Sequence, residues 1–126
     1  MKIQVDEMIY DNLNIVVCFS TDFGSAKAFW DGEEPLVNHV YQVEVDINNT
    51  LEWYRDVLPV ENSKESIQLK NDLIFISGLI DSIDEDGYTV LRLGNYIIPF
   101  LSVGIPFQVG IYVTLLVNSI TLSPVN

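Results

Sequence analysis

Tyr41-Gln42-Val43-Glu44-Val45-Asp46-Ile47 is the stretch that decides the fold class. Its apolar side chains occupy the odd positions and its polar or acidic side chains the even positions, so the apolar period is two residues. This period is typical of a strand with one face on a core and the other in water. We therefore expect a half-buried strand over 41–47, ended by the turn-forming pair Asn48-Asn49.

The same period recurs on both sides of that stretch. Further strands are expected at about 2–10, 13–20, 24–30, 73–83, 88–93, 96–101 and 109–122. Asp86-Gly87 and Gly94-Asn95 are two-residue hairpin signals between the later strands. Gly78 marks a bulge or sharp bend, and a change of apolar phase at Asn118-Ser119 predicts a bulge in the final strand.

The segment 51–63 is the least strand-like part of the chain. Its first part, Leu51 to Leu58, fits either a short helical turn ended by Pro59 or a strand, and a polar loop is expected at 61–65. This segment is the one plausible internal boundary, but neither side alone makes a convincing domain. We therefore expect one β domain over residues 1–126.

Eight or so short strands, glycine-marked bends and almost no helical period predict an all-β fold. We expect a single antiparallel small barrel, closed or partly open, with at most one short helix. A two-sheet β-sandwich is the alternative.

Several motifs carry a resemblance. The strand with a mid-strand glycine, the Asp-Gly hairpin and the glycine-led final strand resemble an OB-fold or a similar small barrel over residues 66–126. The chain also resembles small bacterial proteins of unknown function in 41–47, Leu51-Glu52-Trp53, Leu91-Arg92-Leu93 and Leu122-Ser123-Pro124. This resemblance implies a bacterial single-domain barrel and transfers no reaction or ligand.

The charge balance restricts the partners. Eighteen acidic residues against six basic ones give a formal net charge of −12. Such a field repels phosphate backbones and anionic membranes and attracts basic partners, so we expect neither a nucleic acid nor a membrane as partner. No charged side chain follows Arg92, so the remaining residues must be mostly buried or present an uncharged face. The N-terminal stretch contains Asp6 and Glu7 rather than the apolar run of a secretory signal, which predicts a cytoplasmic protein.

Groups for catalysis or metal binding are sparse. His39 has no second histidine to share a metal, and Cys18 lies in an apolar run, where we expect a small buried hydrophobe. The acidic run 81–87 lacks the ligand pattern of a calcium loop and is expected to be a solvated turn. Glu44 and Asp46 share a strand face, but their spacing does not indicate a catalytic cleft. We expect no enzymatic activity, no cofactor and no metal site.

Both tryptophans lie beside acidic residues, and aromatic anchors ringed by acid suit a surface that binds a basic protein. The candidate binding residues are Trp30, Asp31, Glu33, Glu34, Trp53 and Tyr54. The alternative is that both tryptophans close the ends of the barrel core.

The expected function is a non-enzymatic acidic binding module, such as an inhibitor or immunity-type protein for a basic protein partner. One alternative is a self-associating structural barrel that uses the uncharged 93–126 region as a subunit interface. Another is a barrel that binds a small ligand or oligosaccharide in a pocket holding Trp30 or Trp53.

Overall fold

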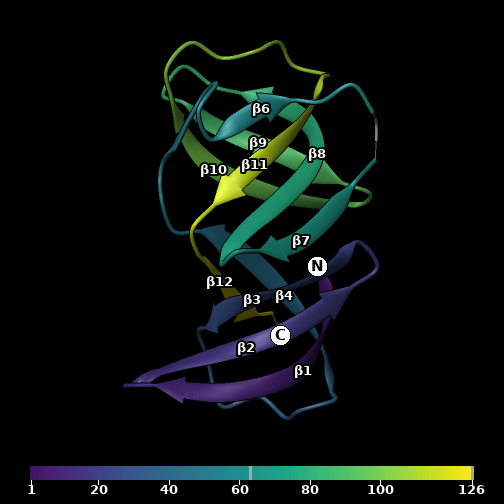
Figure 1. Cartoon of the computed structure of the whole chain (residues 1–126), viewed down its shortest axis with the longest axis vertical. Coiled ribbons are helices and arrows are strands. Elements are labelled where there is room, and N and C mark those ends of the chain that lie inside the picture. Colours follow the sequence, from purple (N-terminus) through teal and green to yellow (C-terminus); the bar gives the residue numbers. More distant parts are fainter. Residues whose placement is uncertain (63, 126) are drawn as a thin grey trace.

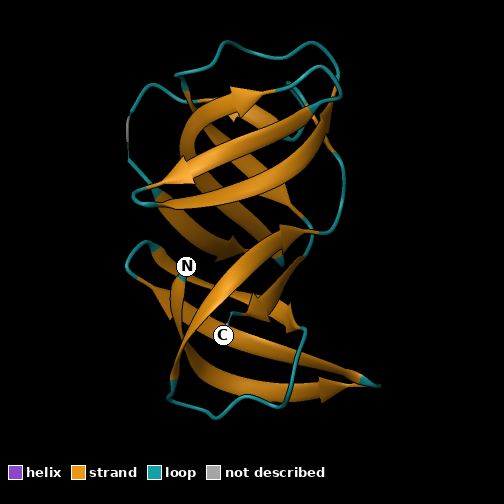
Figure 2. Cartoon of the chain, turned by 180° about the vertical axis from the view of Figure 1, so that it is seen from behind, coloured by secondary structure: helices purple, strands orange, loops and turns teal. Residues whose placement is uncertain are grey.

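The computed structural model describes residues 1–62 and 64–125. Ser63, within the polar loop expected at 61–65, and Asn126, at the end of the domain expected over 1–126, lie outside the described residues. The all-β prediction is confirmed, because the described part of the chain consists of strands, turns and irregular segments without a helix (Figure 2). These residues accordingly contain no helix long and apolar enough to cross a membrane.

The described residues form strands that build two lobes stacked along the long axis of the molecule (Figure 1). The strands are β1 (Lys2–Asp11), β2 (Asn14–Thr21), β3 (Gly24–Trp30), β4 (Val40–Ile47), β5 (Leu51–Glu52), β6 (Val57–Pro59), β7 (Ser66–Lys70), β8 (Leu73–Ile83), β9 (Tyr88–Leu93), β10 (Tyr96–Val103), β11 (Tyr112–Val117) and β12 (Ile120–Pro124).

Five of these strands close a small barrel, as the sequence predicted. In ring order they are β1, β2, β3, β12 and β4, and β4 pairs again with β1. All neighbours in this closed barrel are antiparallel except β3 and β12, which are parallel. Alternate side chains of each strand point into the barrel and form its core, including Val5, Phe19, Ala28, Val45 and Leu122.

The described residues between 48 and 119 form the second lobe, here called the inserted lobe, because the chain leaves the closed barrel after β4 and returns at β12. Its central strand, β8, pairs with β7, β9 and β11, and β10 continues the sheet beyond β9. Its core contains Ile76, Ile80, Leu91, Ile98 and Val113, all fully buried.

The position of the closed barrel differs from the expectation. The OB-like resemblance in the sequence covers 66–126, but the closed ring uses β1–β4 and β12. The phase change at Asn118-Ser119 is a break between β11 and β12, which belong to different lobes, and not a bulge within one strand. Local periodicity detects the change of buried face but not the change of pairing partner.

Other local predictions are confirmed or corrected in detail. Both expected hairpins form, between β8 and β9 and between β9 and β10. The bulge in β8 lies between Ile80 and Ser82 and not at Gly78. Gly78 has a different role, because a β-carbon there would come within 2.6 Å of the Arg92 carbonyl oxygen. Within 51–62, β5 and β6 lie on either side of a turn, in which the Asp56 amide donates to the Glu52 carbonyl oxygen at 2.8 Å; the described residues of this segment form no helix.

Candidate functional site

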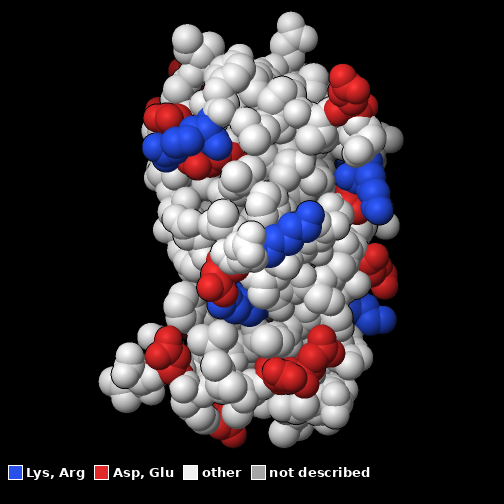
Figure 3. Space-filling view, viewed as in Figure 1, with Lys and Arg blue, Asp and Glu red and all other residues white. Residues whose placement is uncertain are grey.

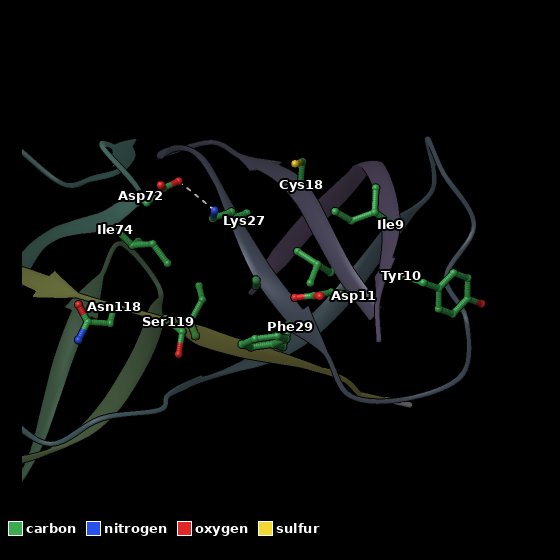
Figure 4. Close-up of a pocket in the computed structure, with 13 residues that line it drawn as sticks. Ile9, Tyr10, Asp11, Cys18, Lys27, Phe29, Asp72, Ile74, Asn118 and Ser119 are labelled. Carbon is green, nitrogen blue, oxygen red and sulfur yellow. Dashed lines mark hydrogen bonds and ion pairs between the residues drawn. The ribbon is translucent and has the colours of Figure 1, made fainter. Parts of the chain in front are cut away.

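An open groove of about 520 Å³ lies between the closed barrel and the inserted lobe (Figure 4). The closed barrel provides one wall from β1, β2 and β3. The opposite wall comes from Asp72 in the turn before β8, from Ile74 in β8, and from Asn118 and Ser119 at the crossing between the lobes. The groove is therefore built from segments far apart in the sequence.

The floor of the groove is an apolar row across three strands. Ile9 pairs with Val16, and Val16 pairs with Phe29. Because successive side chains of a strand point to opposite faces, Val17 and Ala28 face the core while Val16 and Phe29 face outward. Val16 and Phe29 are half-buried and Ile9 is 60% exposed, so an apolar strip of the barrel remains open to a partner.

A polar row lies beside this strip. Cys18 pairs in register with Lys27, and the Lys27 ammonium forms an ion pair with Asp72 of the inserted lobe at 3.1 Å. The prediction that Cys18 is buried is wrong, since its side chain is exposed. The reason is strand alternation: Val17 and Phe19 fill the core, so the residue between them points out.

The β1–β2 hairpin extends the groove beyond the barrel. Leu13 at its tip is 99% exposed, and Ile9 and Tyr10 near the end of β1 are more than half exposed. The Tyr10 hydroxyl donates a hydrogen bond to the Glu34 carboxylate in the β3–β4 connection. The hairpin projects from the body of the molecule (Figures 1 and 3), so the hairpin surface (Ile9, Tyr10 and Leu13) is accessible.

Both tryptophans are buried, as the alternative interpretation requires, but Trp53 belongs to the core of the inserted lobe and not to the closed barrel. The Trp30 indole N–H donates to the Glu33 carbonyl oxygen at 2.7 Å, and its ring packs edge-on against Tyr41. The Trp53 indole N–H donates to Ser102 Oγ at 2.9 Å inside the inserted lobe. Neither indole is available as a contact surface.

The other candidate residues are exposed but do not form one site. Asp31, Glu33 and Glu34 lie in the β3–β4 connection of the closed barrel. Tyr54 lies in the inserted lobe, in the turn between β5 and β6, with a φ of 74° that a bulky residue rarely adopts. Its ring packs edge-on against Phe107, with 4.4 Å between the ring centroids. The predicted site is therefore divided between the two lobes.

Charge is distributed unequally over the two lobes. The residues of the closed barrel, 1–47 and 120–126, include nine acidic and two basic side chains, whereas the inserted lobe includes nine and four. Of the two bases of the closed barrel, Lys27 is paired with Asp72. Figure 3 shows acidic groups on both lobes, including the closed barrel near the base of its projecting hairpin. The groove thus has an apolar floor within the more acidic lobe.

The described residues contain no cluster of three or more histidine, cysteine or acidic side chains placed to hold an ion. In the acidic run 81–87, the Asp84 carboxylate accepts hydrogen bonds from the amides of Asp86 and Tyr88. That carboxylate organises the hairpin turn, as expected for a solvated turn.

The sequence reasoning missed the groove. The available signal was the continuous apolar run at 15–19, which leaves apolar side chains on both faces of one strand. The second wall could not be foreseen, because it comes from the inserted lobe. Comparisons with protein-family models, with curated protein sequences and with solved structures found no significant match to this chain.

Proposed function

We propose that this chain is a non-enzymatic binding module that captures a basic protein partner through the groove and the hairpin surface. The observation that carries the proposal is the solvent-accessible row Ile9–Val16–Phe29 on the more acidic of the two lobes. An apolar patch rimmed by charge is typical of a protein–protein contact. A bacterial, cytoplasmic inhibitor or immunity-type protein is the form of this function that we favour.

The ring order of the closed barrel supports the choice of surface. The order β1-β2-β3-β12-β4, with β12 parallel to β3, supports an OB-like assignment of this barrel. Barrels of that kind use the face of their second and third strands, together with the neighbouring loops, to bind ligands. In this chain that face carries Val16 and Phe29, and the β1–β2 turn flanks it.

The charge favours a basic protein over a nucleic acid. A net charge of −12 accelerates encounter with a positive surface and opposes approach of a phosphate backbone. Single-stranded nucleic acids are held by aromatic platforms within a basic groove. Lys27 is the basic residue that lines this groove, and it is neutralised by Asp72.

An affinity pull-down from the native host at low and high salt tests the proposal. The wild-type chain should retain a basic protein at low salt and lose it at high salt. The double variant Ile9→Thr/Val16→Thr keeps β-branched residues but removes the apolar floor, so it should lose the partner at both salt concentrations. The control Val40→Thr alters an exposed valine of the same barrel outside the groove lining and should behave like wild type.

Two results of the pull-down would contradict parts of the proposal. Retention of the partner by Ile9→Thr/Val16→Thr would remove the groove from the proposal. The absence of any salt-sensitive partner would remove the basic protein.

Self-association is a second candidate function, favoured by a separate observation. The uncharged C-terminal region exposes apolar side chains, with Ile97, Leu101, Val103, Ile105 and Val109 between 46% and 80% exposed. Their common location on the inserted lobe fits a subunit interface. Sedimentation velocity decides this candidate: a concentration-dependent dimer that Ile105→Lys abolishes supports it, and a strict monomer at high concentration removes it.

A small-ligand site is the remaining alternative. Trp30 and Trp53 are both buried and neither lines the groove between the lobes, so a ligand bound in that groove would not contact them.

A further inference from the structure

Among the described residues, the second half of β1 has no strand paired with it on its outer side. β4 pairs with β1 only over Lys2–Gln4, and Val5 then exchanges backbone hydrogen bonds with Asn38 and His39. After the bulge between Val5 and Glu7, the strand pairing described for β1 is with β2 alone. The edge from Glu7 to Asp11 therefore projects with the hairpin.

The register determines which backbone groups face this open edge. Asp11 and Asn14 flank the two-residue turn and form a hydrogen-bonded pair, and such pairs alternate along an antiparallel ladder. Ile9 and Glu7 therefore direct their amide and carbonyl groups toward β2. Met8 and Tyr10 direct theirs outward, where a further strand could pair with them.

The side chains of this edge form a short recognition pattern. Glu7, Ile9 and Asp11 lie on one face of the strand, and Met8 and Tyr10 lie on the other. Ile9, which is 60% exposed, belongs to the apolar row of the groove. One face of the edge thus presents an acidic, an apolar and an acidic side chain at successive alternate positions.

We propose that the partner adds an extended antiparallel strand to the Glu7–Asp11 edge of β1. This inference rests on the proposed function and specifies how the basic protein is held. Opposite charges directly across two strands are stabilising, so basic side chains of the partner lie opposite Glu7 and Asp11. An apolar side chain lies opposite Ile9, and the backbone bonds with Met8 and Tyr10 provide sequence-independent affinity.

The same pattern disfavours a second copy of this chain as the occupant. Antiparallel pairing of two β1 edges centred on Ile9 would place Glu7 of each copy opposite Asp11 of the other. Like charges directly opposite each other are destabilising, and each copy carries a net charge of −12. Charge complementarity therefore selects a basic strand.

Hydrogen exchange in the wild-type chain provides a direct test. The probe is a short synthetic peptide, blocked at both ends, with a central isoleucine, a lysine two positions away on each side, and threonine elsewhere. Saturating peptide should slow exchange of the Met8 and Tyr10 amides, whereas the Glu7 and Ile9 amides are already protected by β2. A peptide with glutamate in place of both lysines is the matched control and should not bind.

A pair of variants separates the backbone contribution from that of the side chain. Tyr10→Ala removes the ring and its bond to Glu34, and Tyr10→Pro additionally removes the outward N–H. The proline variant should bind the lysine peptide about tenfold more weakly than the alanine variant, because one backbone hydrogen bond is lost. If the proline variant does not fold, the hydrogen-exchange experiment on the wild-type chain still tests strand addition.

The results distinguish this inference from the proposed function. Unchanged exchange at Met8 and Tyr10, equal binding of the two peptides, or no binding of the lysine peptide overturns strand addition. If the pull-down still yields a salt-sensitive partner that Ile9→Thr/Val16→Thr loses, the proposed function stands without strand addition. If no such partner is found either, both are wrong.

Discussion

Gly24 lies so close to Ile67 that a β-carbon at residue 24 would come within 1.9 Å of the Ile67 carbonyl oxygen. The two residues form the parallel pair that joins β3 of the closed barrel to β7 of the inserted lobe. The amide of Ile67 also donates to the Phe23 carbonyl oxygen at 2.9 Å. This contact between the lobes thus depends on a residue without a side chain.

Gly24→Ala should therefore destabilise the chain by more than backbone strain alone. The φ of +136° at Gly24 costs a non-glycine residue about 1–3 kcal/mol, and the clash with Ile67 adds to that cost. Gly110→Ala is the matched control, because Gly110 has a φ of +92° but no atom within 4 Å of the added β-carbon. Urea unfolding measures both losses, and equal losses would show that the Ile67 contact contributes nothing.

Ser102→Ala should disrupt a buried polar network in the inserted lobe. Ser102 Oγ accepts from the Trp53 indole N–H at 2.9 Å and lies 2.9 Å from the Gly87 carbonyl oxygen, to which it donates. The substitution leaves the buried indole N–H without its partner, which costs about 1–3 kcal/mol. Thermal unfolding of Ser102→Ala, with Ser25→Ala on an exposed position as control, tests this cost. The loss should shrink in a Trp53→Phe background, and an undiminished loss would contradict the role of that hydrogen bond.

Protonation of Asp56 should contribute to the loss of protein stability at low pH. The hydrogen bond from Arg55 lowers the pKa of the Asp56 carboxyl, the Glu52 amide adds to this effect, and partial burial opposes it. Because the folded-state pKa lies below the ordinary value of about 3.9, the stabilisation is present above that value. It is lost as pH falls through the folded-state pKa.

Urea unfolding at a series of pH values below about 5 measures this contribution. Asp56→Asn should flatten the dependence of stability on pH in that range. Arg55→Met should flatten it as well, because it removes the main cause of the lowered pKa. If the free energy of unfolding still fell steeply with decreasing pH in both variants, Asp56 would not be the source of this pH dependence.

The strands could be predicted because alternation is a local property. Val43 and Val45 are buried while Glu44 and Asp46 face water, as the odd–even pattern of 41–47 requires. The same logic failed at Cys18, because a strand with apolar residues on both faces does not show which face is inside. Predicting the exposed thiol required the knowledge that Val16 and Phe29 line a groove.

The arrangement of the lobes could not be predicted, because it depends on pairings between distant residues. β12 returns to the closed barrel beside β3 and β4, and the only local trace of this return is the phase change at Asn118-Ser119. The groove could not be predicted from the sequence either, since its walls come from both lobes. The candidate acids were located in the sequence, but their separation from Tyr54 follows from the topology alone.

The two tryptophans provide a test of whether the chain unfolds as one domain. Trp30 is buried in the closed barrel and Trp53 in the inserted lobe, so Trp53→Phe and Trp30→Phe each leave one reporter for one lobe. The ends of the inserted lobe are held together at the barrel, where the Asn48 amide donates to the Ser119 carbonyl oxygen at 3.2 Å.

Loss of the inserted lobe would leave β4 and β12 joined by a long flexible loop, whose closure entropy would destabilise the barrel. We therefore expect a single cooperative transition for the whole chain. In each single-tryptophan variant, the urea midpoint from fluorescence should coincide with the midpoint from far-UV circular dichroism, which reports both lobes. Separate midpoints in either variant would show that the lobes are independent domains. Coincident midpoints would mean that a ligand bound in the groove stabilises both lobes together.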